Sequence, residues 1–495
     1  MTNYKMSIAS AGRPCALLLA ALLAGCAISP SPITSEQRAA QVQLDRAAMY
    51  RDQEPLTAPL TLQAAMARAV NYNLENRVKL MEQALAMGQV DLARYDMLPR
   101  LTAAAGYFTR NNDLVTDSVD VNTRLPVLSN TTSQERTHHT FDLSLTWNVL
   151  DFGVSYYQAH QQADRSLIAR ERQRKTLHAL IQQVRQAYWL AVGAQALEGR
   201  VDPLLQQVNR ALADAERVEA EKLRPPLETL NYRKAMLDIV RQLEAIRDEL
   251  TQAKPRLASL MNLAPGTPYS LVVPATLKTP VLPLTLDGME ERALRERPEL
   301  YEADLQERIS AAEAKKAVLR MLPGVELSFG PHYDSNAFLH NNNWVDAGLR
   351  VTWNLFNLLS GPKQKEIAEA QVEVARTQRL ALSMAVLTQV HVSWQEFQGR
   401  QRQYELAQKL WEIDDRILEH TRIGAQNDAQ SRLNEIRSGV SALMADYRRY
   451  QNYANLQTAY GQAIASVGMD PIAVAATADA RPDAGTALAA AEKQD

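Results

Sequence analysis

Few residues in the chain have the type and spacing that chemistry requires. The adjacent pair His138-His139 stands in a polar stretch that we interpret as a long loop. Such a pair can ligate a metal ion, and it also fits a surface or extracellular loop without any ligand. No nucleophile elbow, phosphate-binding loop, dinucleotide fingerprint or zinc-ligand spacing occurs. We therefore expect no catalytic residues, no metal centre and no enzymatic activity.

One of the two cysteines has a predicted chemical role. Lys5 and Arg13 form a basic region ahead of the short apolar run Ala16–Ala24, and Leu23-Ala24-Gly25-Cys26 resembles a bacterial lipobox. Cleavage before Cys26 would leave it as the new N-terminus, with palmitate and other lipid on its thiol and amine. The alternative is an ordinary secretory signal with an incidental cysteine. We predict a covalent lipid on Cys26 and no other cofactor.

Composition excludes two broad classes of protein. The balance of 54 basic against 56 acidic residues argues against a nucleic-acid partner, because such binding depends on phosphate neutralisation. Mean hydropathy is −0.29, and the sequence has no uninterrupted apolar stretch of about 18 residues. This excludes a polytopic helical membrane protein. A transmembrane β-barrel stays open, since its strands give a weaker hydropathy signal.

The mature chain contains an internal repeat. Leu60-Thr61-Leu62 and Thr146-Trp147-Asn148 recur in the same order as Leu284-Thr285-Leu286 and Thr352-Trp353-Asn354. A tandem duplication accounts for several separated matches in register better than chance does. We predict a signal peptide at 1–25, a lipid-anchored N-terminal segment at 26–59, a first repeat at 60–265, a linker at 266–283, a second repeat at 284–471 and a flexible tail at 472–495.

Each repeat is predicted to hold one helix, two strands and a long helical hairpin. Apolar residues recur every three or four positions over 61–97 and 285–321, which predicts one helix in each range. Long helices are expected at about 153–223 and 362–424, and Gly193, Gly199 and Pro203 should interrupt the first. The return helix after 226 has a sustained heptad pattern, beginning with Met236, Ile239, Leu243 and Ile246, which predicts a coiled-coil seam.

The strands alternate between apolar and polar residues. Odd positions over 141–149, 325–333 and 345–355 are apolar and even positions are mostly polar, whereas 101–110 alternates less cleanly. This alternation fits a lipid-facing and lumen-facing barrel strand, and it equally fits half of a soluble antiparallel sheet. Four strands cannot close a barrel, so a membrane role requires several copies of the chain. Two copies give a filled barrel and three leave room for water.

In these features the chain resembles the TolC-type outer membrane factors, in their lipoprotein form. The similarity rests on Arg297-Pro298-Glu299-Leu300, on Leu98-Pro99 and Leu322-Pro323, and on the run from Trp147 to Gly153. It implies a mainly α protein with a small β part, a homotrimer whose twelve-strand barrel continues into a long α-helical coiled-coil barrel in the periplasm. It also implies passive export across outer membrane lipid, with a periplasmic adaptor and an inner-membrane transporter of the RND or ABC type as partners.

The resemblance directs attention to two groups of residues. Trp147 and Trp353 end the second strands, where they either lie at a membrane interface or pack against helices. Charges at the helical tips either pair between chains to close the periplasmic end or remain solvated; the gate candidates are Arg224, Glu228, Asp428, Arg432 and Glu435. We expect an outer membrane efflux or secretion channel. The alternative is a non-conducting coiled-coil lipoprotein scaffold in the periplasm.

Overall fold

A computed structural model describes residues 30–116, 119–120, 122–126, 131–221, 225–424 and 429–470, without the side chains of 424–433. The chain divides into two compact units, Met1–Glu54 and Pro55–Asp495. In the first unit, helix α2 (Ser35–Met49) begins with a capping box between Thr34 and Gln37. The predicted signal peptide, the lipid site at Cys26 and the C-terminal tail lie outside the described residues.

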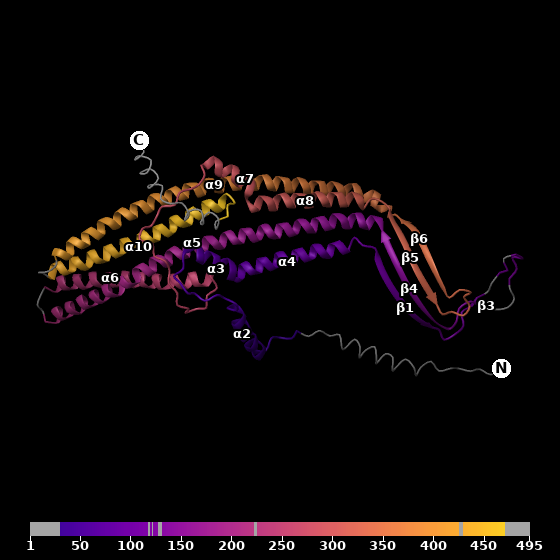
Figure 1. Ribbon diagram of the computed structural model, residues 1–495, viewed down its shortest axis with the longest axis horizontal. Coiled ribbons are helices and arrows are strands. Elements are labelled where there is room, and N and C mark those ends of the chain that lie inside the picture. Colours follow the sequence, from indigo (N-terminus) through magenta and orange to yellow (C-terminus); the bar gives the residue numbers. More distant parts are fainter. Residues whose placement is uncertain are drawn as a thin grey trace, which may run out of the picture. The chain divides into compact units, whose positions relative to one another are not determined.

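The second unit contains the predicted four-stranded sheet. It is antiparallel throughout, with the strand order β1-β4-β5-β6 (Figure 1). The strands are β1 (Arg100–Thr109), β4 (Thr137–Asn148), β5 (Gly324–Asp334) and β6 (Asn343–Thr352). A two-stranded pairing of β2 (Val115–Thr116) with β3 (Thr131–Thr132) lies in the long connection between β1 and β4. Sequence periodicity alone did not indicate this small pairing.

The helix predicted at the start of each repeat is two helices, which corrects the sequence-based expectation. They are α3 (Leu62–Tyr72) with α4 (Leu74–Tyr95), and α7 (Leu286–Glu296) with α8 (Pro298–Leu319). At the first break the Asn73 side chain accepts a hydrogen bond from Asn76 N at 3.1 Å and caps α4. At the second break Pro298 occupies the first turn of α8, where a missing N–H costs little.

The long helices form two hairpins. Helix α5 (Val149–Ala220) returns as α6 (Pro226–Leu260), and α9 (Phe356–Gly424) is followed by α10 (Ala429–Ser466). The predicted interruption of α5 was wrong, because the helix is continuous through Gly193, Gly199 and Pro203. Buried Val201 and Leu205 hold the segment around Pro203 against its neighbours, which offsets the lost backbone hydrogen bond.

Packing between the helices follows the strand order. Near the sheet the sequence of contacts is α4 to α5, α5 to α8 and α8 to α9, and beyond it α6, α5, α10 and α9 follow one another (Figure 1). The largest core cluster joins α3, α5, α6 and α10, and it includes the predicted seam residues Met236 and Leu243, which are fully buried. The edges of the helical layer are therefore α4 and α6 on one side and α9 on the other.

Within the part of the chain that the structure describes, no helix is both long and apolar enough to cross a membrane.

Candidate functional site

One face of the four-stranded sheet is apolar from edge to edge. The pairings Leu101 with Leu145, Phe329 with Leu145, and Phe329 with Ala347 place odd-numbered residues of all four strands on the same side. Most of its large side chains are exposed to solvent in the single chain; they include Leu101, Tyr107, Phe141, Leu145, Leu327, Phe329, Tyr333, Val345, Leu349 and Val351. A continuous exposed apolar surface of this extent marks an interaction with lipid or with another protein.

Aromatic residues lie toward both ends of this apolar face. Trp147, which is 36% exposed, meets Phe152 edge-on at the start of α5 with ring centroids 5.8 Å apart. Trp353 follows β6 and donates a hydrogen bond from Nε1 to the carbonyl of Met321 at 3.1 Å. Tyr107 and Tyr333 lie near the opposite ends of their strands. The two tryptophans thus contact the strand–helix junction, and their role at a membrane interface stays a prediction.

The opposite face of the sheet is polar and carries an ordered charge cluster. His332 on β5 lies between Asp142 on β4 and Asp346 on β6, with Nδ1–Oδ1 and Nε2–Oδ2 distances of 2.6 and 3.2 Å. The indole of Trp344 stacks on the imidazole at a centroid distance of 5.4 Å. Nearer the helices, Glu326 faces Arg350 across the same sheet. Sequence alternation predicted this polar face, but the bridging histidine required the strand register.

The predicted loop position of His138-His139 is corrected, because both residues belong to β4. His138 is buried, stacks on Phe108 and approaches Gln134 with its Nε2, while His139 lies beside Tyr107. Alternate residues of a strand point to opposite faces, so the two imidazoles diverge and cannot share a ligand. Among the described residues, no group of three histidine, cysteine, aspartate or glutamate side chains could hold a metal ion.

The predicted gate residues are described only in part. Arg224 and Asp428 lie outside the described residues, and Arg432 belongs to α10 without a described side chain. Glu228 is exposed in the first turn of α6, and Glu435 is half-buried on α10. Their proposed role as a gate depends on contacts between copies of the chain and stays a prediction.

Close to the tip of the first hairpin, an ion-pair cluster joins the two helices. Arg233 on α6 donates to Glu219 and Glu216 on α5, at 2.5 and 3.0 Å. The hydrogen bond with Glu219 is the main reason why the pKa of the Arg233 guanidinium lies above its usual value. Arg233 thus joins α6 to α5 within the same hairpin.

A second charge cluster, which sequence reasoning missed, links the two hairpins. Asp446 on α10 is buried and accepts from Arg200 on α5 at 2.5 Å and from Arg449 at 2.8 Å. The Arg449 guanidinium also lies 3.8 Å from the centre of the Trp411 ring on α9. Three helices therefore meet at one buried carboxylate. Only an acidic residue inside the apolar pattern of α10 could have indicated it in advance.

Both edges of the helical layer expose apolar seams. On α4 the seam residues follow heptad spacing and are between 40% and 68% exposed; they are Leu74, Val78, Met81, Leu85, Leu92 and Tyr95. On α9 the corresponding seam consists of Leu406, Leu410, Ile413 and Ile417, all exposed. Heptad seams of this kind pack against another helix when they are buried. Each edge thus presents a helix-binding surface that the single chain leaves uncovered.

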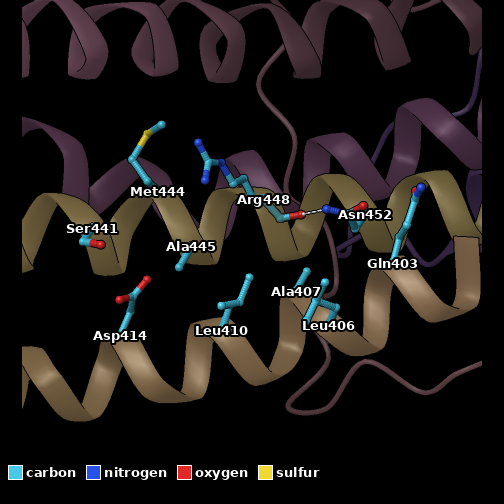
Figure 2. Close-up of a pocket in the computed structure, with 10 residues that line it drawn as sticks. All are labelled: Gln403, Leu406, Ala407, Leu410, Asp414, Ser441, Met444, Ala445, Arg448 and Asn452. Carbon is cyan, nitrogen blue, oxygen red and sulfur yellow. Dashed lines mark hydrogen bonds between the residues drawn. The ribbon is translucent and has the colours of Figure 1, made fainter.

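The α9 seam borders a groove between α9 and α10, with a volume of about 350 Å³. Figure 2 shows Leu406 and Leu410 on one wall and Ala445 and Arg448 on the other. Asp414 is the single acidic residue among its ten lining side chains. The groove therefore lacks the convergent acid, base and nucleophile groups that a reaction requires. Its surface suits contact with another helix.

Known proteins resemble the chain in sequence and in fold. The family model of outer membrane efflux proteins matches residues 68–263. Among curated proteins, no sequence matches the chain.

Three solved structures share the fold at low sequence identity. The outer membrane protein VceC from Vibrio cholerae is 15% identical, with a TM-score of 0.60 and coverage of 82% of this chain and 96% of that one. The MtrE outer membrane channel of Neisseria gonorrhoeae, solved in its open state, is 16% identical, with a TM-score of 0.57 and coverage of 81% of this chain and 89% of that one. The CmeC outer membrane channel of Campylobacter jejuni is 12% identical, with a TM-score of 0.61 and coverage of 83% of this chain and 90% of that one. The likeness to these three structures is one of fold.

Proposed function

We propose that this chain, which the family model of outer membrane efflux proteins matches over residues 68–263, is the outer membrane channel of a tripartite efflux or secretion system. In this role it is a passive conduit from the periplasm to the exterior, and an inner-membrane transporter supplies the energy. The observation that carries the proposal is the four-stranded sheet with one apolar and one polar face. Lipid on one side and water on the other require this division.

The sheet also supports assembly from several copies. Strands β1 and β6 are its edges, and unpaired edge groups are not tolerated in lipid. Pairing β1 of one copy with β6 of the next satisfies both edges, and three copies give about twelve strands, enough for an aqueous lumen. Helix α4 precedes β1 and helix α9 follows β6 in the chain, and each of these helices carries an exposed apolar seam. We propose a homotrimer in which strands and helices close together into one tube.

The proposed cellular setting follows from the family match and from the N-terminal sequence. A covalent lipid on Cys26 would anchor the chain to the outer membrane, with the helices in the periplasm. The helical ends would meet a periplasmic adaptor, which connects the channel to a transporter of the RND or ABC type. Replacing Cys26 with serine should abolish the added acyl mass in intact-protein mass spectrometry. A mass difference no larger than that of the cysteine-to-serine exchange itself would exclude lipidation at this residue.

The competing function is a coiled-coil lipoprotein scaffold that conducts nothing. Such a scaffold accounts for the helical hairpins, but it gives no reason for the exposed apolar face of the sheet. Conductance across planar lipid bilayers separates the two functions. We expect stepwise current increases on addition of the purified chain. A protein that inserts without current would support the scaffold.

The gate proposal has a separate test in the same assay. Asp428→Asn combined with Arg432→Gln removes two of the candidate charges, and we expect larger single-channel conductance if they help to hold the periplasmic end closed. Arg94→Gln with Asp91→Asn is the matched control, because this exposed pair lies within one turn of α4. If the Asp428→Asn/Arg432→Gln variant has the same conductance as the control, these two residues do not help to close the periplasmic end.

A further inference from the structure

The charges on the polar face of the sheet are unevenly distributed along the strands. Toward the helices, Glu326 faces Arg350 at 3.7 Å, and Arg100 begins β1 on the same face. Toward the loops, the acidic residues are Asp142, Asp334 and Asp346, with His332 between the first and the last. Within the described strands, no lysine or arginine lies on the polar face at this level. The face is therefore acidic at this level, and Arg110 and Arg136, the latter paired with Asp113, follow just beyond the ends of β1 and β4.

The acidic end is held in a fixed arrangement by side-chain contacts across three strands. Asp142 and His332 are direct partners in the β4–β5 register, and Trp344 is the β6 partner of His332. His332 is 20% exposed, whereas Asp142 and Asp346 are 40% and 60% exposed. The imidazole is thus enclosed by the two carboxylates and the stacked indole. The carboxylates keep contact with the solvent on the polar face.

Even a protonated His332 leaves this cluster negative. Both ring nitrogens lie within hydrogen-bond distance of a carboxylate oxygen, and only the imidazolium can donate to both. One positive charge is then opposed by two carboxylates in the cluster. Asp334, two residues further along β5 on the same face, adds a third carboxylate. Fixed charges of one sign lining a narrow passage raise the local concentration of the opposite ion.

We propose that Asp142 and Asp346, held apart by His332, form a specificity-determining acidic band that makes the strand end of the conduit selective for cations. The inference rests on the proposed function, because it takes the polar face of the sheet to line the lumen. In an assembly of three copies the band would repeat around the axis. The cargo that it favours is cationic, and anionic compounds of similar size pass less readily.

Reversal potentials in planar bilayers under a KCl gradient test the band. We expect the unmodified channel to prefer K⁺ over Cl⁻. In the Asp142→Asn/Asp346→Asn variant the ratio of K⁺ to Cl⁻ permeability should fall by about twofold or more, since charges in a water-filled lumen act over roughly 10 Å at about 0.1 M salt. Both asparagines can still accept hydrogen bonds from His332. Asp346→Asn alone, at the more exposed position, should show a smaller change in the same direction.

The matched control removes charge from the same face without changing the net charge. In Glu326→Gln/Arg350→Gln the permeability ratio should equal that of the unmodified channel. A conducting Asp142→Asn/Asp346→Asn channel with unchanged selectivity would overturn the acidic band and leave the proposed function intact. An unmodified channel without cation preference would overturn it as well. Absence of any current from the unmodified protein would instead contradict the proposed function on which the band rests.

Discussion

Gly193 lies where α5 packs closely against α10. A Cβ atom built at this position would come within 2.7 Å of the Cβ of Tyr450, a buried residue of α10. At Gly399 in α9, which occupies the corresponding place in the second repeat, such an atom would meet nothing within 4 Å. Helix packing therefore requires glycine at position 193 but not at position 399.

Alanine substitutions at the two glycines should have opposite effects. Gly193→Ala forces the helices apart, and we expect it to lower the free energy of unfolding by about 1–3 kcal/mol. Gly399→Ala should raise it by about 0.5–1 kcal/mol, because glycine is the poorer helix former. Unfolding of both purified variants, followed by circular dichroism, measures the two changes. Equal stabilisation by both would mean that α5 and α10 do not touch at Gly193.

His178 on α5 makes stability depend on pH. Burial and then the neighbouring charge of Arg174 lower the pKa of His178 below its usual value, against smaller opposing effects of Asp470 and Glu299. The folded chain therefore holds the neutral imidazole, whereas the unfolded chain takes up a proton near pH 6.5. This contribution to stability is complete above pH 6.5 and is lost as pH falls through the lowered pKa.

The pH effect can be isolated by substitution. We expect the melting temperature of the unmodified protein to fall between pH 7.5 and pH 5, and the fall should be smaller in His178→Gln, which cannot titrate. His160→Gln is the control, because that histidine is exposed on the same helix and meets Tyr156 edge-on. The same pH dependence in all three proteins would show that His178 remains accessible to protons in the folded state.

At the scale of elements, the first helix of each predicted repeat is broken, and the two breaks have different causes. Asn73 caps α4 and also donates from Nδ2 to the carbonyl of Leu260 at 3.1 Å. Its counterpart Arg297 has no capping side-chain bond, and the break there follows from Pro298. Asn73→Ala should lower the free energy of unfolding by about 1–2 kcal/mol, because it leaves a backbone N–H of α4 without its cap.

Serine at the same position provides the comparison. Asn73→Ser keeps an oxygen that can accept from Asn76 N but loses the bond to Leu260. The difference between the alanine and serine variants in chemical denaturation therefore measures the cap alone. If both variants lose the same stability, the cap contributes nothing and the bond to α6 accounts for the effect.

Strand alternation was the most informative sequence signal. The odd positions of β4, β5 and β6 were predicted to share a face, and the observed register confirms it. Strand β1 alternates less cleanly because Ala103, Ala105 and Gly106 are too small to give contrast between the faces. The contacts of Asp142, His332 and Asp346 were not predictable, since they depend on a register between distant strands that no single stretch of sequence specifies.

Helix boundaries were less predictable than helix identity. Period and length indicated the long helices and the seam of α6, and the structure confirms both. Proline and glycine were given too much weight in α5, where tertiary packing overrides local preference. The break at Asn73 escaped notice because the apolar pattern continues across it from Met66 to Leu85, although the residues before the break are buried and those after it are exposed.

At the scale of the whole molecule, exposed apolar surface lies where a neighbouring copy would pack. The α4 seam stands at one edge of the helical layer and the α9 seam at the other. Met81→Glu/Leu85→Glu places two charges inside the proposed contact between copies. We expect this variant to be monomeric by size-exclusion chromatography with light scattering in detergent, because burying unpaired carboxylates is costly.

A volume-conserving exchange is the control for the seam. Met81→Leu/Leu85→Met keeps the surface apolar and should remain a trimer. If the charged variant also stays a trimer, the α4 seam does not lie between copies. If the unmodified protein is itself monomeric, the proposed assembly is wrong.

Thiol labelling during current recording tests the central claim, that one face of the sheet lines a water-filled conduit and the other meets lipid. Ser144 and Leu145 are adjacent on β4 and point to opposite faces. A charged, membrane-impermeant thiol reagent should reduce the current through Ser144→Cys channels and leave Leu145→Cys and unmodified channels unchanged. A reagent that reduces the current through Leu145→Cys channels but not through Ser144→Cys channels would contradict this claim. Absence of current from the unmodified protein would contradict it as well.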